Sequence, residues 1–346
     1  MTLLFADGFE RYASAANQDM GPHMAYVWAT GGGTSRAGRI AGLATNFGAY
    51  WDKSGQGPTG ITLGTTKFSA ISAGVLGVGI KVDSFTNAGV AEYIQLKSGS
   101  TVVLTVGINT SGYFQLRNGA TVLGTWNAPI AINTWYYVEL KFTLGGSGTG
   151  VLEMRVEGFP GIVLPSVTTH ASVFTMNNLS LNSSDRNSVQ YDDLYICSQS
   201  GTYNNDFLGN FRSERIAPTG AGSVTQWTPN TGTNFGAVDE VPQSGATDYV
   251  SESTAGETDL YAFADPTIAG NIVGIRQSFV ARKVTGDTNL TSALKIGGTT
   301  YEGDLATVTD AVNWKLFQQI REREPAASAA WDLTNLSAAE FGVRKK

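Results

Sequence analysis

The feature that most constrains the fold of this chain is an alternation of apolar and polar side chains with a period of two. The segment TWYYVELKFT (134–143) shows it most clearly. Tyr137, Glu139 and Lys141 fall on one side of this segment, and the residues between them on the other. Because successive side chains of a strand point to opposite faces, the pattern predicts a half-buried antiparallel strand.

Similar runs recur along the first 200 residues, separated by Gly, Asn and Ser. They lie at 77–82, 91–97, 101–108, 113–117, 151–156 and 191–196. Glycine accounts for 42 of 346 residues, and charged residues make up 15% of the chain, against roughly 25% in an ordinary soluble protein. Short strands with many glycine-rich turns, such as LGGSGTG (144–150), predict an all-β sandwich.

The composition changes after Cys197. Residues 198–271 are rich in Gly, Thr, Asn, Ser and Pro, and isolated anchors such as Trp227 predict an ordered, extended path rather than a linker. Strand patterns resume at 271–283, 293–296, 299–304 and 312–322. The sequence SAAE (337–340) fits a capping box and predicts a helical turn that Gly342 ends. We expect two domains, 1–204 and 205–346, the second with an extended beginning at 205–270.

Charge and cysteine content exclude several classes of protein. The net charge is −6, which argues against binding to a phosphate backbone and hence against a nucleic-acid partner. Cys197 is the only cysteine, so no intrachain disulfide can form. The first residues, MTLLFADGFERY, lack a signal-peptide pattern, and no apolar run reaches the length of a membrane span. We therefore expect a chain made in the cytoplasm that does not insert into membranes.

Three segments resemble the concanavalin A-like lectin/glucanase superfamily in its laminin-G-like and bacteriophage forms. They are LLFADGFERY (3–12), the stretch from INTWYYVEL to MRVEGF (132–159), and YDDLYI (191–196). The resemblance covers about residues 1–200. It implies a jelly-roll sandwich for the first domain, followed by a second, smaller β-rich domain.

Four further segments resemble a domain found beside such sandwiches in tailed-phage virion proteins. They are LGNFRSERIAPTGAG (208–222), SVTQWTPNTGTNF (223–235), DYVSESTAGETDLYAF (248–263) and WDLTNLSAAEFGVRKK (331–346). The resemblance implies a non-enzymatic structural protein of the virion (tail, fibre or head decoration) with a lectin-like surface domain. Its partners would be other virion proteins and copies of itself, with a trimer as one option by analogy. The alternatives are a receptor module for host glycans and a glycoside hydrolase.

The adjacent Asp192 and Asp193 are the most conspicuous acidic pair. On a straight strand they face opposite ways, one toward a turn or an ion and the other toward solvent, so they cannot act as an acid–base dyad. Glu153 and Glu157 would be about 13 Å apart on a strand, too far for a glycosidase pair. His23 and His170 show no zinc-ligand spacing.

The same resemblance suggests a structural calcium. In the glucanase branch, carboxylates near the first strand and on the last strand hold such an ion. The analogous groups here are Asp7 and Glu10, with Asp192 or Asp193. Calcium takes six to eight oxygen ligands, so backbone carbonyls and waters would have to contribute. The alternative is that these carboxylates accept hydrogen bonds from turn amides or arginines.

Sugar binding would use exposed aromatic rings flanked by polar side chains. The loop candidate is Tyr50-Trp51-Asp52, and the second is Trp126-Asn127. The alternative is that both tryptophans belong to the core, since large aromatic side chains are mostly buried.

Overall fold

A computed structural model describes residues 2–9, 28–30, 36–41, 47–52, 60–64, 67–85, 90–183, 188–240, 247–267, 269–286 and 288–346; at 29–30, 36–41 and 47–52 it describes the backbone only. The chain divides into two units, Met1–Ser213 and Glu214–Lys346. Both are built from antiparallel strands, which confirms the all-β prediction. In the described part, no helix is long and apolar enough to cross a membrane.

The first unit contains an eight-stranded sheet in the order β13-β12-β11-β6-β15-β4-β3, with β1 paired to β15. Its strands are β1 (Leu3–Asp7), β3 (Arg36–Ala41), β4 (Phe47–Asp52), β6 (Ala73–Val82), β11 (Tyr136–Thr143), β12 (Gly150–Val156), β13 (Phe159–Val167) and β15 (Val189–Ser198).

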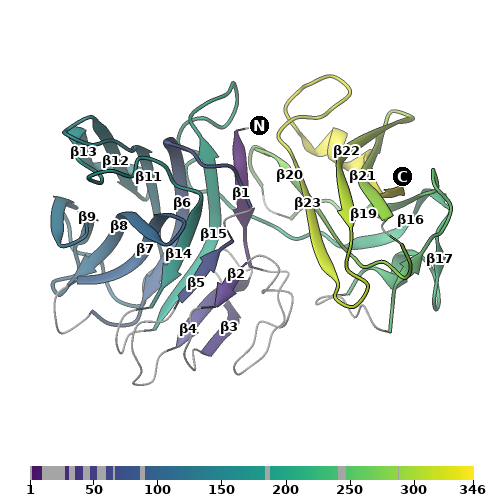
Figure 1. Ribbon diagram of the computed structural model, residues 1–346, viewed down its shortest axis with the longest axis horizontal. Helices are drawn as coiled ribbons and strands as arrows, with labels where there is room; N and C mark the ends of the chain where they lie inside the picture. Colours follow the sequence, from purple (N-terminus) through teal and green to yellow (C-terminus); the bar gives the residue numbers. More distant parts are fainter. Residues whose placement is uncertain are drawn as a thin grey trace. The chain divides into compact units, whose positions relative to one another are not determined.

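A seven-stranded sheet in the order β10-β9-β8-β7-β14-β5-β2 lies against the first (Figure 1). Its strands are β2 (Trp28–Thr30), β5 (Gly60–Leu63), β7 (Val90–Ser98), β8 (Thr101–Asn109), β9 (Phe114–Asn118), β10 (Thr121–Thr125) and β14 (Asn178–Asn182). The first unit is therefore a two-sheet sandwich, as the strand patterns predict.

The core of the sandwich follows directly from the alternation in the sequence. On β11, Val138, Leu140 and Phe142 are at most 2% exposed, and on β7, Ile94 and Leu96 are completely buried. Each such side chain contributes about 1.5–3 kcal/mol when it leaves water. The residues between them must point away from the core, so each sheet has an outer face that is largely polar.

The second unit contains three smaller sheets. A five-stranded sheet has the order β16-β19-β24-β21-β22, and β17-β18 and β20-β23 form two-stranded ribbons. The elements are β16 (Pro218–Thr225), β17 (Thr228–Pro229), the 3₁₀ turn η2 (Phe235–Ala237), β18 (Val250–Ser251), β19 (Thr258–Phe263), β20 (Ile275–Ala281), β21 (Thr288–Ile296), β22 (Thr299–Val308), β23 (Lys315–Arg321), α1 (Leu333–Ser337) and β24 (Glu340–Lys345). Strands β16 to β19 lie in the stretch that the sequence predicts to be extended.

The prediction that a helical turn begins at Ser337 is wrong. Helix α1 ends at that residue, and its N-cap is Asp332, whose Oδ1 accepts a hydrogen bond from the Asn335 N–H at 2.8 Å. The Asn335 side chain in turn accepts from the Asp332 N–H at 2.9 Å, so this pair forms the capping box. Gly342 does not end a helix but lies within β24, between β19 and β21.

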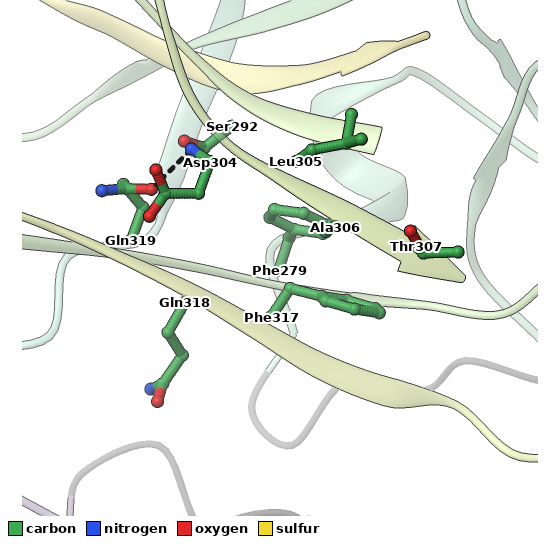
Figure 2. A pocket seen from close by; sticks show the side chains of 9 residues that line it. All are labelled: Phe279, Ser292, Asp304, Leu305, Ala306, Thr307, Phe317, Gln318 and Gln319. Carbon is green, nitrogen blue, oxygen red and sulfur yellow. Dashed lines mark hydrogen bonds between the residues drawn. The ribbon is translucent and has the colours of Figure 1, made fainter. Parts of the chain in front are cut away.

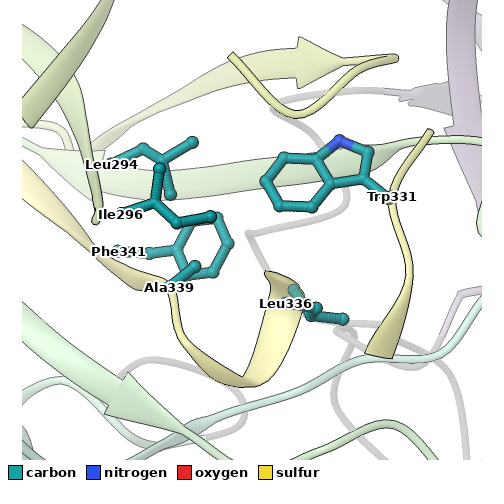
Figure 3. Close-up of a cluster of buried hydrophobic side chains, with 6 residues drawn as sticks. All are labelled: Leu294, Ile296, Trp331, Leu336, Ala339 and Phe341. Atoms are coloured by element: carbon teal, nitrogen blue, oxygen red, sulfur yellow. The ribbon is translucent and has the colours of Figure 1, made fainter. Parts of the chain in front are cut away.

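A hydrophobic cluster in the second unit explains why 340–345 is a strand. Phe341 is buried with Leu294 and Ile296 of β21. Leu336 of α1 and Trp331, two residues before this helix, complete the cluster (Figure 3). Strand geometry places Phe341 and Val343 on the same face, and both are buried. Tertiary packing therefore overrides the local capping signal.

The close approach of β24 to β19 yields a first prediction. A Cβ atom at Gly342 would lie 1.8 Å from the Asp259 carbonyl oxygen, whereas a Cβ at Gly220 in β16 would meet nothing closer than 4.0 Å. We expect Gly342→Ala to destabilise the second unit by about 3 kcal/mol, and Gly220→Ala to change its stability by less than about 1 kcal/mol. Hydrogen exchange of β19 and β24 peptides in increasing urea measures both. Equal effects would contradict the prediction.

Candidate functional site

A β-bulge sets the positions of the two adjacent aspartates. Asp192 lies opposite Gly79 and Tyr195 opposite Gly77, so three steps along β15 match two along β6. Asp193 takes up the extra residue with a φ of +52°. Asp192 therefore shares a face with Tyr195, whereas on a straight strand, three residues apart, the two would face opposite ways.

Neither aspartate faces solvent, which corrects a second expectation. Asp192 is 1% and Asp193 2% exposed. The Asp192 carboxylate accepts a hydrogen bond from the Asp193 N–H at 2.8 Å. Asp193 Oδ1 accepts from the Ser213 N–H at 2.8 Å, and Arg212 Nε lies 3.7 Å from Oδ2. Through Asp193, the pair therefore contacts the chain at Arg212 and Ser213.

The segment 206–213, which we call the strap, covers the outer face of the eight-stranded sheet at this point. Glu139 is buried and accepts hydrogen bonds from the Gly209 N–H, at 2.9 Å, and from the Tyr195 hydroxyl. The Leu208 N–H donates to the same hydroxyl at 3.2 Å. The Tyr195 ring lies over Gly77, where a Cβ would come within 2.1 Å of it. The Gly209 N–H of the strap therefore donates a hydrogen bond to a carboxylate that is buried from water.

Two further contacts fix the beginning of the strap. Lys141 Nζ lies 3.0 Å from the Asp206 carboxylate, and the Arg155 guanidinium stacks 3.8 Å from the centre of the Phe207 ring. With the strap in place, the acidic groups beneath it are not accessible to a substrate. This cluster is structural in the described conformation.

The described residues do not fit a calcium site. Asp7 is completely buried, and its two oxygens accept hydrogen bonds from the Phe9 N–H and from Trp28 Nε1, both at 3.1 Å. In the described part of the chain, no three His, Cys, Asp or Glu side chains come together in a way that could hold a metal ion. Glu10 lies outside the described residues, so its role as a ligand stays a prediction.

The sugar-stacking candidates are placed only in part. The side chains of Tyr50, Trp51 and Asp52 lie outside the described residues, although the backbone of β4 is described. Trp126 is 9% exposed, and a Cβ at Gly161 would lie 2.0 Å from its ring. Trp126 therefore packs against β13 and is buried, as expected if it is a core residue and not a sugar-stacking one. Asn127 beside it is exposed.

The outer face of the seven-stranded sheet carries a continuous row of polar side chains. On β9, Phe114 and Leu116 are completely buried in the core, so Gln115 and Arg117 lie on the opposite face. Register pairs then align one residue from each of five neighbouring strands. These residues are Thr62, Ser180, Gln95, Thr105 and Arg117. At about 4.8 Å per strand, the row is about 19 Å long.

Hydrogen bonds join several members of this surface to one another. The hydroxyls of Thr62 and Ser180 lie 2.7 Å apart, and Gln95 Nε2 donates to Glu92 Oε2 at 2.8 Å. Thr105 and Ser180 are nearly inaccessible, at 1% and 2%. We define the polar face by its described members: Thr62, Glu92, Gln95, Thr105, Gln115, Arg117, Asn178 and Ser180.

Three buried atoms of the polar face have no hydrogen-bond partner among the described residues. They are Gln115 Oε1, Arg117 Nε and Asn178 Oδ1. The other side-chain atoms of these residues do have partners, for example Gln115 Nε2 with Thr125 Oγ1 at 3.3 Å and Arg117 Nη2 with the Ala120 carbonyl at 2.8 Å. More than nine in ten buried polar groups are satisfied in folded proteins. The three atoms are inaccessible, so the accessible part of the polar face consists of its half-buried members Thr62, Glu92, Gln95 and Arg117.

Sequence reasoning missed this surface, because it searched for aromatic rings in loops. The signal was present in the strand patterns AEYIQLK and YFQLR, whose polar positions alternate with the buried residues. Alternation alone could have aligned Gln95, Gln115 and Arg117 on one outer face. It could not have shown which of their atoms lack partners.

No protein-family model and no curated protein matches the chain. Solved structures of a similar fold include a sialidase with a TM-score of 0.41 and 10% identity. The match covers 58% of this chain but only 19% of the sialidase. A marine PL-14 alginate lyase from Aplysia kurodai has a TM-score of 0.41 and 8% identity, with 57% of this chain and 99% of the lyase covered. A Bacillus subtilis protein of unknown function with a galectin-like fold has a TM-score of 0.37 and 10% identity, with 57% and 96% covered.

These likenesses concern the fold, a β-sandwich found in carbohydrate-active and lectin-like proteins. They contradict the expectation that the chain is not an enzyme, because most of the similar structures are enzymes, the sialidase and the alginate lyase among them.

The acidic cluster beneath the strap yields a second prediction. Burial, together with the charge of Asp192, raises the pKa of Asp193 to about 7, and burial also raises the pKa of Glu139. An exposed aspartate has a pKa of about 3.9, so opening the strap releases a proton. The closed strap is therefore most stable below about pH 4 and becomes less stable as the pH rises to 7.

Hydrogen exchange of strap peptides between pH 4.5 and 8, corrected for intrinsic exchange, measures this dependence. Asp193→Asn keeps an oxygen for the Ser213 N–H and should remove most of the pH dependence of strap exchange. The dependence that is left would come from Glu139. Asp206→Asn on the same strap is the control and should keep the slope, because Asp206 is mostly exposed and hydrogen bonds and Lys141 lower its pKa. An Asp193→Asn variant with the full slope would show that Asp193 is not its source.

Proposed function

We propose that the first unit binds a polysaccharide along the polar face, and that the chain is a component of a tailed-phage particle. The observation that carries the first part is the row of polar side chains aligned across five neighbouring strands, of which Thr62, Gln95 and Arg117 are accessible. A hydroxyl-rich ligand supplies both donors and acceptors, and so can pair with the Gln95 amide and the Arg117 guanidinium at once. The length of the polar row, about 19 Å, suits an extended ligand rather than a single small molecule.

The chemistry of the polar face also restricts the ligand. Amide and hydroxyl side chains predominate, and Glu92 is already engaged by Gln95. Arg117 is a guanidinium with several directed donors. Such a surface is suited to sugar hydroxyls and ring oxygens, and it offers little to an apolar ligand.

The proposed place in a phage particle is supported by the resemblance of four segments within 208–346 to a virion domain. On this proposal, the second unit contacts other virion proteins or copies of the chain, and the polar face contacts glycans of the host surface. A trimeric assembly remains the analogy drawn from fibres and decoration proteins.

Binding to an array of bacterial surface polysaccharides tests the polar face. We expect at least one polysaccharide to bind, and Gln95→Leu and Arg117→Met each to weaken its binding about tenfold, or about 1.4 kcal/mol. Arg282→Met is the control, because Arg282 is an exposed arginine of the second unit. The same wells, assayed for new reducing ends, distinguish cleavage from binding alone. Binding that none of the variants weakens would place the ligand elsewhere.

Antibody labelling of purified particles tests the second part of the proposal. We expect gold-labelled antibody against this chain to decorate intact particles from a culture that produces it. The labelled position would separate tail, fibre and head decoration. A chain that is absent from washed particles and stays in the host lysate would contradict a virion role.

A further inference from the structure

The second unit contains a hollow of about 270 Å³ between β22 and the β20-β23 ribbon (Figure 2). Asp304 and Ala306 line it from β22, Phe279 from β20, and Phe317 and Gln319 from β23. The hollow belongs to this unit alone, and neither the strand patterns nor the motifs of the sequence predict it.

The hollow exists because a small residue stands where a large one would fill the space. Asp304, Ala306 and Val308 are alternate residues of β22 and share a face, and Val308 is completely buried in a cluster with Ala281 and Leu290. Phe279 and Phe317 pack against that cluster. Ala306 has only a methyl group to place in the gap beside them.

The two phenylalanines form one aromatic wall. They are directly paired across β20 and β23, with ring centres 5.4 Å apart and planes inclined by 22°. Both rings are half-buried, so part of the wall stays accessible. An aromatic wall of this kind offers an apolar, polarisable surface to the C–H groups of a ligand.

The end of the hollow near Asp304 is polar. Gln319 Oε1 accepts a hydrogen bond from the Asp304 N–H at 2.8 Å, which fixes the Gln319 amide (Figure 2). The Asp304 side chain is exposed. Thr307, whose side chain is also exposed, lies at the other end of the hollow (Figure 2). A carboxylate that stays accessible can accept two hydrogen bonds from neighbouring hydroxyls of one ligand.

We propose that this hollow is a binding subsite for one pyranose ring of a neutral glycan. The C–H face of the sugar lies against Phe279 and Phe317, and its hydroxyls donate to the Asp304 carboxylate. The volume is just below the range of about 300–1,000 Å³ typical of pockets for drug-sized ligands, which suits a single ring. The carboxylate at the polar end disfavours an anionic sugar. This site is separate from the polar face and does not depend on it.

Saturation-transfer NMR of the whole chain tests the subsite with three probes, D-glucose, D-galactose and N-acetyl-D-glucosamine. We expect transfer to at least one of them. Ala306→Leu fills the hollow and should reduce the transfer at least fivefold. Asp304→Asn keeps the shape of the side chain but removes its charge, and should weaken binding about tenfold. Thr300→Leu, an exposed position on the same strand, is the control for added bulk and should bind like the natural chain.

The outcomes separate this subsite from the polar face. Gln95→Leu and Arg117→Met should leave monosaccharide transfer unchanged, and Ala306→Leu should leave polysaccharide binding by the polar face unchanged. Hydrogen exchange of β24 for the variants of the second unit, and of β8 for those of the polar face, confirms that each variant is folded. Absence of transfer to all three sugars, or equal transfer in Ala306→Leu, would overturn the proposal.

Discussion

Burying one face of each sheet is the constraint on which the first unit depends. Two layers of alternating strands bring their apolar side chains together, and the same alternation turns a polar row outward on each side. Backbone groups are satisfied within the sheets, but the outward side chains are not, and each outer face needs its own partners. The two faces of this sandwich differ in how they obtain them.

On the eight-stranded sheet, the partners come from the chain itself. The strap places the backbone N–H groups of Gly209 and Ser213 on Glu139 and Asp193, so two buried carboxylates are bonded without any metal or ligand. Burial still raises the pKa of both groups, which shows that these hydrogen bonds only partly offset the loss of water. On the seven-stranded sheet, Gln95 and Arg117 are only half-buried and keep donors and acceptors at the surface. This asymmetry makes the second face, and not the acidic one, the candidate for binding.

The sequence predicts the sandwich well and the details of its sites poorly, for a definite reason. The period-two pattern at 134–143 is a property of consecutive residues, and β11 follows it from Tyr136 to Thr143. The bulge at Asp193 depends instead on the register between β15 and β6, which no single segment encodes. The SAAE motif shows the same limit. Phe341 is buried against Leu294 and Ile296, which makes the residues after the motif a strand. The capping box of the helix is formed instead by Asp332 and Asn335. The polar face could have been predicted from the alternation, but the atoms of it that lack hydrogen-bond partners could not.

Glycine connects these observations. Its abundance predicts turns, yet several glycines lie inside strands, where they admit a neighbour at close range. Gly77 accepts the Tyr195 ring, Gly161 accepts the Trp126 ring, and Gly342 accepts the backbone of β19. In each case another part of the chain lies where a side chain would otherwise stand: an aromatic ring at Gly77 and Gly161, and a backbone carbonyl at Gly342. The same principle operates with alanine at position 306, except that no side chain of the chain occupies the space it leaves. Small residues in the strands of both units therefore make room for large groups of the chain, but the space beside Ala306 stays open next to two aromatic rings and a carboxylate. This open space has the shape of a binding site.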